Sequence, residues 1–164
     1  MTQLTTIYIG VGSNLCEPIQ QAQRAIDTLR QHTQLFDVKA SALYHSKPVG
    51  PQDQPDYINA VVEAKTHLAA HHVLDLLQHI EHKQGRVRQR HWGERTLDLD
   101  LLLYGVAEIH TPRLTVPHAY LTERSFVLYP LAELAPDLLI PGAEPLKRYL
   151  ERVKNDLDTV KNAN

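Results

Sequence analysis

The spacing of apolar residues along this chain alternates between two periods, which predict strands and helices in turn. Two-residue alternation or a short apolar run predicts strands at 7–11, 36–44, 57–65 and 96–104. Apolar stripes at helical spacing predict helices from Pro18, over 69–84, near 125–134 and from Pro145. Gly105 is expected to turn the fourth strand back as a hairpin toward 108–110. The polar tail after about Lys154 is expected to fray.

The order strand, helix, strand, strand, helix, strand matches the split βαβ pattern of ferredoxin-like folds. We therefore expect an α/β (α+β) protein in which helices pack on an antiparallel sheet in three layers. A chain of 164 residues is long enough for one such domain and too short for two. The sequence thus predicts a single three-layer domain over 1–164.

The predicted fourth strand places two acidic side chains on the same face. Asp98 and Asp100 lie two residues apart, and leucines at positions 97, 99, 101 and 103 are expected on the opposite face. Paired carboxylates on a half-buried strand repel each other unless a cation lies between them. Magnesium prefers such oxygen ligands and keeps open positions for phosphate oxygens. The pair on its own is more typical of an exposed polar face.

Directly before this strand lies an arginine-rich segment bounded by Gly85 and Gly93. Guanidinium groups suit phosphate because they are planar, permanently charged and bidentate. A run of arginines alone is most often a solvated loop. Joined to the two aspartates and to Trp92, it favours chemistry on a nucleotide polyphosphate.

Other candidate residues leave alternatives open. The Gly10-x-Gly12 pair lacks the rest of a dinucleotide fingerprint, and a tight strand-to-helix turn explains it. His118 suits a donor or acid beside phosphate, or a cap before a helix. Tyr57 and Asn59 share one strand face, which suits either a stacked heterocycle or an ordinary strand surface.

Composition narrows the class of partner. A formal net charge of −2 argues against a protein that coats nucleic acid. The single cysteine, Cys16, excludes an internal disulfide and fits a reducing compartment. No signal-like or bilayer-spanning apolar run is present, so we expect a cytoplasmic protein.

Five blocks together resemble the 6-hydroxymethyl-7,8-dihydropterin pyrophosphokinase family of folate biosynthesis. They are Gly12-Ser13-Asn14-Leu15, Pro48-x-Gly50-Pro51-Gln52-x-Gln54-Pro55-Asp56-Tyr57-x-Asn59-Ala60, Gly85-Arg86-x-Arg88, Trp92-Gly93-x-Arg95-Thr96-Leu97-Asp98-Leu99-Asp100 and Thr115-Val116-Pro117-His118. The resemblance implies a ferredoxin-like fold and transfer of pyrophosphate from ATP to the hydroxymethyl oxygen of the pterin, with release of AMP. It also implies a monomer with small-molecule substrates, and no nucleic acid or membrane.

The resemblance implies a role for each matching residue. It places the pterin between Tyr57 and Phe126, with its polar edge on Asn59 and with further contacts from Pro48, Val49, Gly50 and Trp92. It implies ATP contacts from Gln78, Glu81, Arg88, Arg113, Thr115, His118 and Arg124. It implies catalytic roles for Arg86, Arg95, His118, Asp98 and Asp100, the two aspartates holding two Mg²⁺ ions.

Two other functions share these features. One is a nucleic-acid-binding module on the same scaffold, and the other is a different Mg²⁺-dependent nucleotidyltransferase or a phosphohydrolase. In the favoured function, the segment 86–92 is expected to close over both substrates, because water would otherwise hydrolyse ATP.

Overall fold

The computed structural model of the protein describes residues 3–14, 17–47, 56–84 and 97–160. The helices are α1 (Pro18–Gln31), α2 (Ala70–Lys83), α3 (Ser125–Leu134), α4 (Leu146–Arg152) and the short 3-10 helix η1 (Leu121–Glu123). The strands are β1 (Thr5–Ser13), β2 (Phe36–Ala40), β3 (Tyr44–Ser46), β4 (Tyr57–Thr66), β5 (Asp98–Tyr104), β6 (Ile109–His110), β7 (Thr115–Val116) and β8 (Asp158–Thr159).

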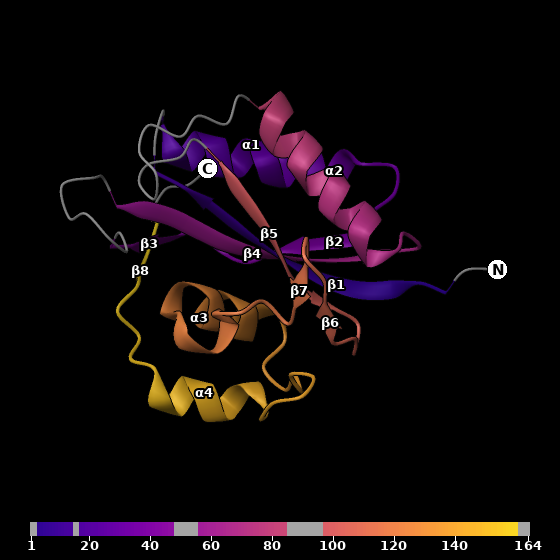
Figure 1. The fold of residues 1–164 in the computed structure, drawn as a ribbon. Coiled ribbons are helices and arrows are strands. Elements are labelled where there is room, and N and C mark those ends of the chain that lie inside the picture. Colours follow the sequence, from indigo (N-terminus) through magenta and orange to yellow (C-terminus); the bar gives the residue numbers. More distant parts are fainter. Residues whose placement is uncertain (1–2, 15–16, 48–55, 85–96, 161–164) are drawn as a thin grey trace.

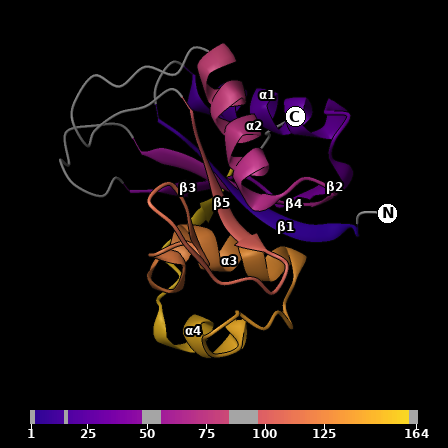
Figure 2. The ribbon, with the colours of Figure 1, turned by 45° about the vertical axis from the view of Figure 1, so that its right-hand side comes forward.

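The main sheet is antiparallel and runs in the order β5-β1-β4-β3-β8, with β2 also paired to β4. Helices α1 and α2 cover one face and α3 covers the other, while α4 packs against α3 on the side away from the sheet (Figures 1 and 2). The three layers and the antiparallel sheet confirm the predicted ferredoxin-like fold class.

Each face of the sheet has its own apolar core. Toward α1 and α2, fully buried side chains such as Ile7, Ile9 and Leu77 fill the interior. Toward α3, Val61 and Leu128 belong to a second cluster. Because successive residues of a strand point to opposite faces, β1, β4 and β5 contribute to both cores.

The helices agree with the apolar stripes. Helix α1 begins at Pro18, α3 spans the predicted residues, and α2 differs from the prediction by one residue at each end. Helix α4 begins directly after Pro145. No helix among the described residues is long and apolar enough to cross a bilayer.

The single strand predicted over 36–44 is wrong, because the structure divides it into β2 and β3. At the break, the Ser41 N–H donates to the Val61 carbonyl and the Ser41 Oγ accepts from the Val61 N–H, each at 2.9 Å. The serine side chain thus replaces one backbone partner of β4, which lets residues 41–43 leave the ladder while β4 continues as one strand.

The alternation predicted for β5 also fails at one residue. Ile9 of β1 faces Leu101, whereas Tyr8 faces Leu103, so Leu102 is an extra residue in a β-bulge. Leu102 and Leu103 are therefore both buried on the α3 side, and only the leucines at 97, 99 and 101 face α1 and α2.

Two predictions about the second half of the chain are corrected. The strand β6 pairs with β7 and not with β5, so the turn at Gly105 (φ +53°) does not form the expected hairpin. Residues 158–160 of the tail pair with β3: Tyr44 faces Thr159, and the Val160 N–H donates to the Leu43 carbonyl at 2.9 Å. Strand β3 supplies the backbone partners of the tail. The sequence pattern could not reveal this pairing.

Candidate active site

A cavity of about 430 Å³ lies on the α3 face of the sheet. Its base is formed by β1, β3, β4 and β5, and its wall by the segment that leads from β7 into α3. The lining includes seven of the residues singled out from the sequence, namely Tyr57, Asn59, Asp98, Asp100, His118, Arg124 and Phe126. Residues from three separate motifs thus meet in one place.

Two glycines form the floor of the cavity. Gly10 lies between Val61 on β4 and Asp100 on β5, and Gly12 lies between Asn59 and Asp98 in the same way. Both are inside β1, and neither has a positive φ, so the predicted turn is wrong. Because glycine has no side chain, these two residues leave space above the centre of the sheet.

Asp98 and Asp100 border this floor on β5, where both are half-buried and line the cavity. Between them, the Leu99 N–H donates to the Glu81 carboxylate at 2.7 Å. Glu81 is 8% exposed and is not among the cavity-lining residues. This contact from α2 fixes the backbone that carries both aspartates.

The donor set suits a hard cation completed by substrate oxygens. Among the described residues, no group of three or more histidine, cysteine or acidic side chains could hold a metal ion by itself. Magnesium is commonly held by one or two carboxylates together with phosphate oxygens and water. Asp98 and Asp100 fit that arrangement, and they do not fit a closed structural metal site.

His118 is tied to the aspartate strand by its backbone, because its N–H donates to the Leu102 carbonyl at 3.0 Å. Burial lowers the pKa of His118 and the charge of Arg124 lowers it further, while Asp98 partly opposes both. A lowered pKa favours the neutral form of this side chain. A long hydrogen bond of 3.4 Å from the Tyr120 N–H to Nδ1 favours the tautomer with its proton on Nε2. The neutral ring can thus donate a hydrogen bond from Nε2 without carrying a net charge.

Arg124 lies between two aromatic rings at the wall. Its Cζ atom is 4.8 Å from the ring centroid of Tyr120 and 5.4 Å from that of Phe126. Such cation–π contacts hold a guanidinium over the ring faces. Tyr120 was not among the predicted site residues, although an aromatic residue two positions after His118 was an available signal.

The opposite side of the cavity belongs to β3 and β4. Asn59 and Ser46 are 6% and 7% exposed, and the Ser46 hydroxyl donates to Oδ1 of Asn59. Tyr57 and Lys47 also line the cavity. Ser46 and Lys47 were missed, because nothing in their sequence context distinguishes them from other residues at a strand end.

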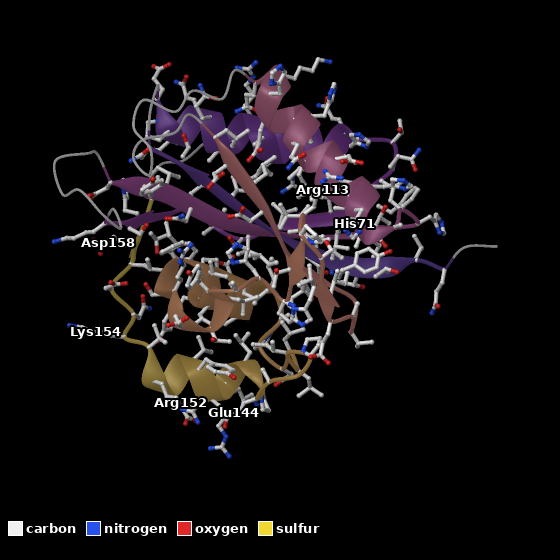
Figure 3. The ribbon with its side chains drawn as sticks, in the orientation of Figure 1. His71, Arg113, Glu144, Arg152, Lys154 and Asp158 are labelled. Atoms are coloured by element: carbon white, nitrogen blue, oxygen red, sulfur yellow. The ribbon has the colours of Figure 1, made fainter. Side chains whose placement is uncertain are left out.

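The remaining predicted nucleotide residues gather elsewhere. The Arg113 guanidinium donates to Asp75 at 2.7 Å and to Gln78 at 3.3 Å, and it lowers the pKa of Asp75. Figure 3 shows Arg113 beside α2. Thr115 is exposed on β7, and neither it nor Arg113 or Gln78 lines the cavity. These residues form a second polar group at α2 and β7, outside the lining of the cavity.

Seven predicted site residues lie outside the described residues: Pro48, Val49, Gly50, Arg86, Arg88, Trp92 and Arg95. The same holds for the expected closure of 86–92 and for Cys16.

Solved structures with a similar fold come from a larger protein. The HPPK-DHPS wild type of Plasmodium falciparum with pteroate matches with a TM-score of 0.72 and 12% identity over 93% of this chain. A structure described as HPPK-DHPS in complex with substrates matches with a TM-score of 0.69 and 11% identity. This chain spans 43% of each of those chains, and at such identities the likeness shows the fold alone.

Sequence relatives are much more similar. A 2-amino-4-hydroxy-6-hydroxymethyldihydropteridine pyrophosphokinase from Haemophilus influenzae is 50% identical over 149 residues, covering 91% of this chain and 93% of the relative. The enzyme of the same name from Pseudomonas aeruginosa is 49% identical over 144 residues, covering 88% and 89%. A family model described as 7,8-dihydro-6-hydroxymethylpterin-pyrophosphokinase (HPPK) matches residues 8–136. The resemblance drawn from the motifs is confirmed, and the chain belongs to the 7,8-dihydro-6-hydroxymethylpterin pyrophosphokinase family.

Proposed function

We propose that this protein transfers the pyrophosphoryl group of ATP to the hydroxymethyl oxygen of 6-hydroxymethyl-7,8-dihydropterin, with release of AMP, in folate biosynthesis. Its relatives are named for this activity. The observation that carries the proposal is the cavity in which Asp98 and Asp100 border a glycine floor opposite Tyr57 and Asn59. The aromatic and amide side suits a flat heterocyclic ring, and the carboxylate side suits a polyphosphate with its bound cation.

The pterin occupies the space between the two aromatic side chains. Tyr57 on β4 and Phe126 at the start of α3 line the cavity from different elements, as two faces of a ring sandwich require. The Asn59 amide offers one acceptor and two donors to the polar edge of the ring. Pro48, Val49, Gly50 and Trp92 complete this site in the proposal.

The phosphates of ATP lie on the aspartate side. Asp98 and Asp100 would hold Mg²⁺, two ions in the proposal, and the bound metal would neutralise charge on the phosphate oxygens. His118 donates from Nε2, and Arg124 adds a fixed positive charge at the wall. The surface of Gln78, Arg113 and Thr115 receives the rest of the nucleotide. Glu81 acts through the strand that it braces at Leu99, and Arg86, Arg88 and Arg95 supply further charge.

The protein's contribution to the reaction is placement and charge neutralisation. The hydroxymethyl oxygen attacks the β-phosphorus, and the bond from that phosphorus to the oxygen bridging to the α-phosphorus breaks. AMP leaves with the bridging oxygen, and the hydroxyl proton is released to bulk solvent by the end of the turnover. Neutral His118 stabilises phosphate charge as a donor and does not need to transfer a proton.

The test is an incubation with ATP, Mg²⁺ and the pterin, followed by identification of the nucleotide product. AMP that forms only with the pterin present supports the proposal, and removal of Mg²⁺ with EDTA should stop its formation. ADP would indicate ordinary phosphoryl transfer. Nucleotide hydrolysis without the pterin would indicate a phosphohydrolase, and either result overturns the proposal.

We further infer a cytoplasmic monomer with a single domain over 1–164 that binds neither nucleic acid nor membrane. The net charge of −2 and the small-molecule substrates support this inference. Light scattering after size exclusion tests the monomer: a mass near twice 18.6 kDa would contradict it.

A further inference from the structure

Ser46 and Asn59 are neighbours on the cavity face of two paired strands. In the β3–β4 register, Tyr44 faces Asn59 and Ser46 faces Tyr57, so Ser46 and Asn59 are diagonal neighbours. Both side chains are more than nine-tenths buried, and the Ser46 hydroxyl donates to the amide Oδ1. A buried polar pair of this kind restricts both partners.

The other end of the Asn59 amide extends toward the glycine floor. A Cβ atom placed on Gly12 would lie 3.4 Å from Asn59 Nδ2. The amide therefore spans the space between the β3 hydroxyl and the bare backbone of β1. Its terminal torsion has a broad energy profile, so without a partner the amide plane would rotate.

We propose that Ser46 is a positioning residue for substrate recognition, whose hydroxyl holds the Asn59 amide in the plane that binds the polar edge of the pterin. This inference rests on the proposed function. The pterin edge presents a donor beside an acceptor, and a single amide can pair with both only when its plane matches that of the ring. A fixed amide loses less rotational freedom on binding, which raises affinity without any new contact to the substrate.

The chain offers a matched control in Ser41. Ser41 is also 7% exposed and also bonds β4 through its hydroxyl, but its partners are the Val61 N–H and the Ala42 carbonyl, and it does not line the cavity. Ser41→Ala therefore removes a comparable buried hydrogen bond from the same sheet. It should lower the melting temperature and leave the KM for the pterin unchanged.

Steady-state kinetics of AMP formation test the proposal with three single variants at Ser46 and Asn59 and with one double variant. Ser46→Ala should raise the KM for the pterin about fivefold, while kcat and the KM for ATP change less than about twofold, as expected for uniform substrate binding. Ser46→Thr keeps a hydroxyl and should restore the KM. In an Asn59→Ala background, Ser46→Ala should cause no further rise, because Ser46 acts through the amide.

The possible outcomes distinguish a failure of the positioning role from a failure of the proposed function. An active wild type whose pterin KM is unaffected by Ser46→Ala overturns the positioning role and leaves the proposed function standing. Effects of Ser46→Ala and Asn59→Ala that multiply would also overturn it, since Ser46 would then act independently of the amide. A wild type that makes no pterin-dependent AMP overturns the proposed function, and this inference with it.

Discussion

The two faces of the sheet are built from the same strands and serve different purposes. On the side of α1 and α2, strand residues such as Ile7, Ile9 and Leu99 are large, apolar and buried. On the side of α3, the intervening positions of β1 are Gly10 and Gly12, and those of β5 are acidic. One face therefore maximises buried apolar area, which stabilises the fold. The other gives up part of that area to leave a cavity.

The hollow covers only one end of the α3 face. Toward Gly105, the side chains of Tyr8, Val61 and Leu102 fill the interlayer space against α3. Toward the other end of β1, glycines and polar residues replace them. Stability and recognition are thus separated by strand face and by position along the strand. Substitutions should therefore separate the two properties.

The largest effect is expected for Asp100→Ala. Turnover should fall by a factor of about a thousand or more, because the phosphates lose a metal ligand. The melting temperature should change little, since Asp100 does not belong to either apolar cluster. AMP formation and thermal unfolding measure the two properties. As a control, Asp137→Ala removes an exposed carboxylate 3.1 Å from Lys147 and should leave turnover unchanged. Turnover of Asp100→Ala within tenfold of the wild type would contradict the assignment.

The reverse behaviour is expected for Leu77→Ala on the filled face. Leu77 is fully buried on α2, so the free energy of unfolding should fall by about 2–5 kcal/mol through lost burial and a new cavity. Turnover per folded molecule should remain near the wild-type value at low temperature. Urea unfolding measures the loss, and Leu139→Ala, at a residue 71% exposed, is the matched control. A stable but inactive Leu77→Ala would break the separation.

Gly12→Ala tests the glycine floor directly. The nearest heavy atom to the added Cβ would be Asn59 Nδ2, at 3.4 Å, so the protein can accommodate it. Alanine also restricts the unfolded chain more than glycine, so stability should be unchanged or rise by up to about 1 kcal/mol. The KM for the pterin should rise about tenfold, equivalent to about 1.4 kcal/mol. An unchanged KM would show that the substrate does not approach the floor.

The smallest effect concerns a polar contact between the sheet and α3. The Tyr44 hydroxyl donates to the Glu133 carboxylate, and burial together with this bond raises the pKa of Tyr44 from 10.0 to about 12. A raised pKa in the folded state means that this stabilisation is complete below pH 10 and is lost as the pH rises to about 12. Tyr44→Phe should make unfolding less dependent on pH in that range. Tyr8, whose pKa burial also raises, would retain part of the dependence. Equal slopes for wild type and variant would contradict the assignment.

Much of the fold could be predicted because local patterns determine it. The stripe of α1 and the alternation around Asp98 and Asp100 depend on residues close in sequence. The two-strand division at Ser41 and the bulge at Leu102 could not be predicted, because each depends on hydrogen bonds to a strand distant in sequence. A bulge moves a side chain to the other face of the sheet, although the pattern of apolar residues in the sequence is unchanged.

The same limit applies to the site. Tyr57, Asn59 and the aspartates were found because their residue types suggest chemistry. Gly12 was misinterpreted because a missing side chain gains meaning only when the neighbouring strands are known. Ser46 was missed for a similar reason, since its partner lies 13 residues away.

The short strand β8 has a practical consequence for handling this protein. It covers the backbone of β3, whose last residue, Ser46, borders the cavity. Uncovered strand edges pair with strands from other molecules. A chain shortened to end before Asp158 should therefore aggregate through β3, next to the cavity. Affinity tags and surface anchors are therefore better attached ahead of Thr5, where β1 begins at the end of the strand farthest from Gly12.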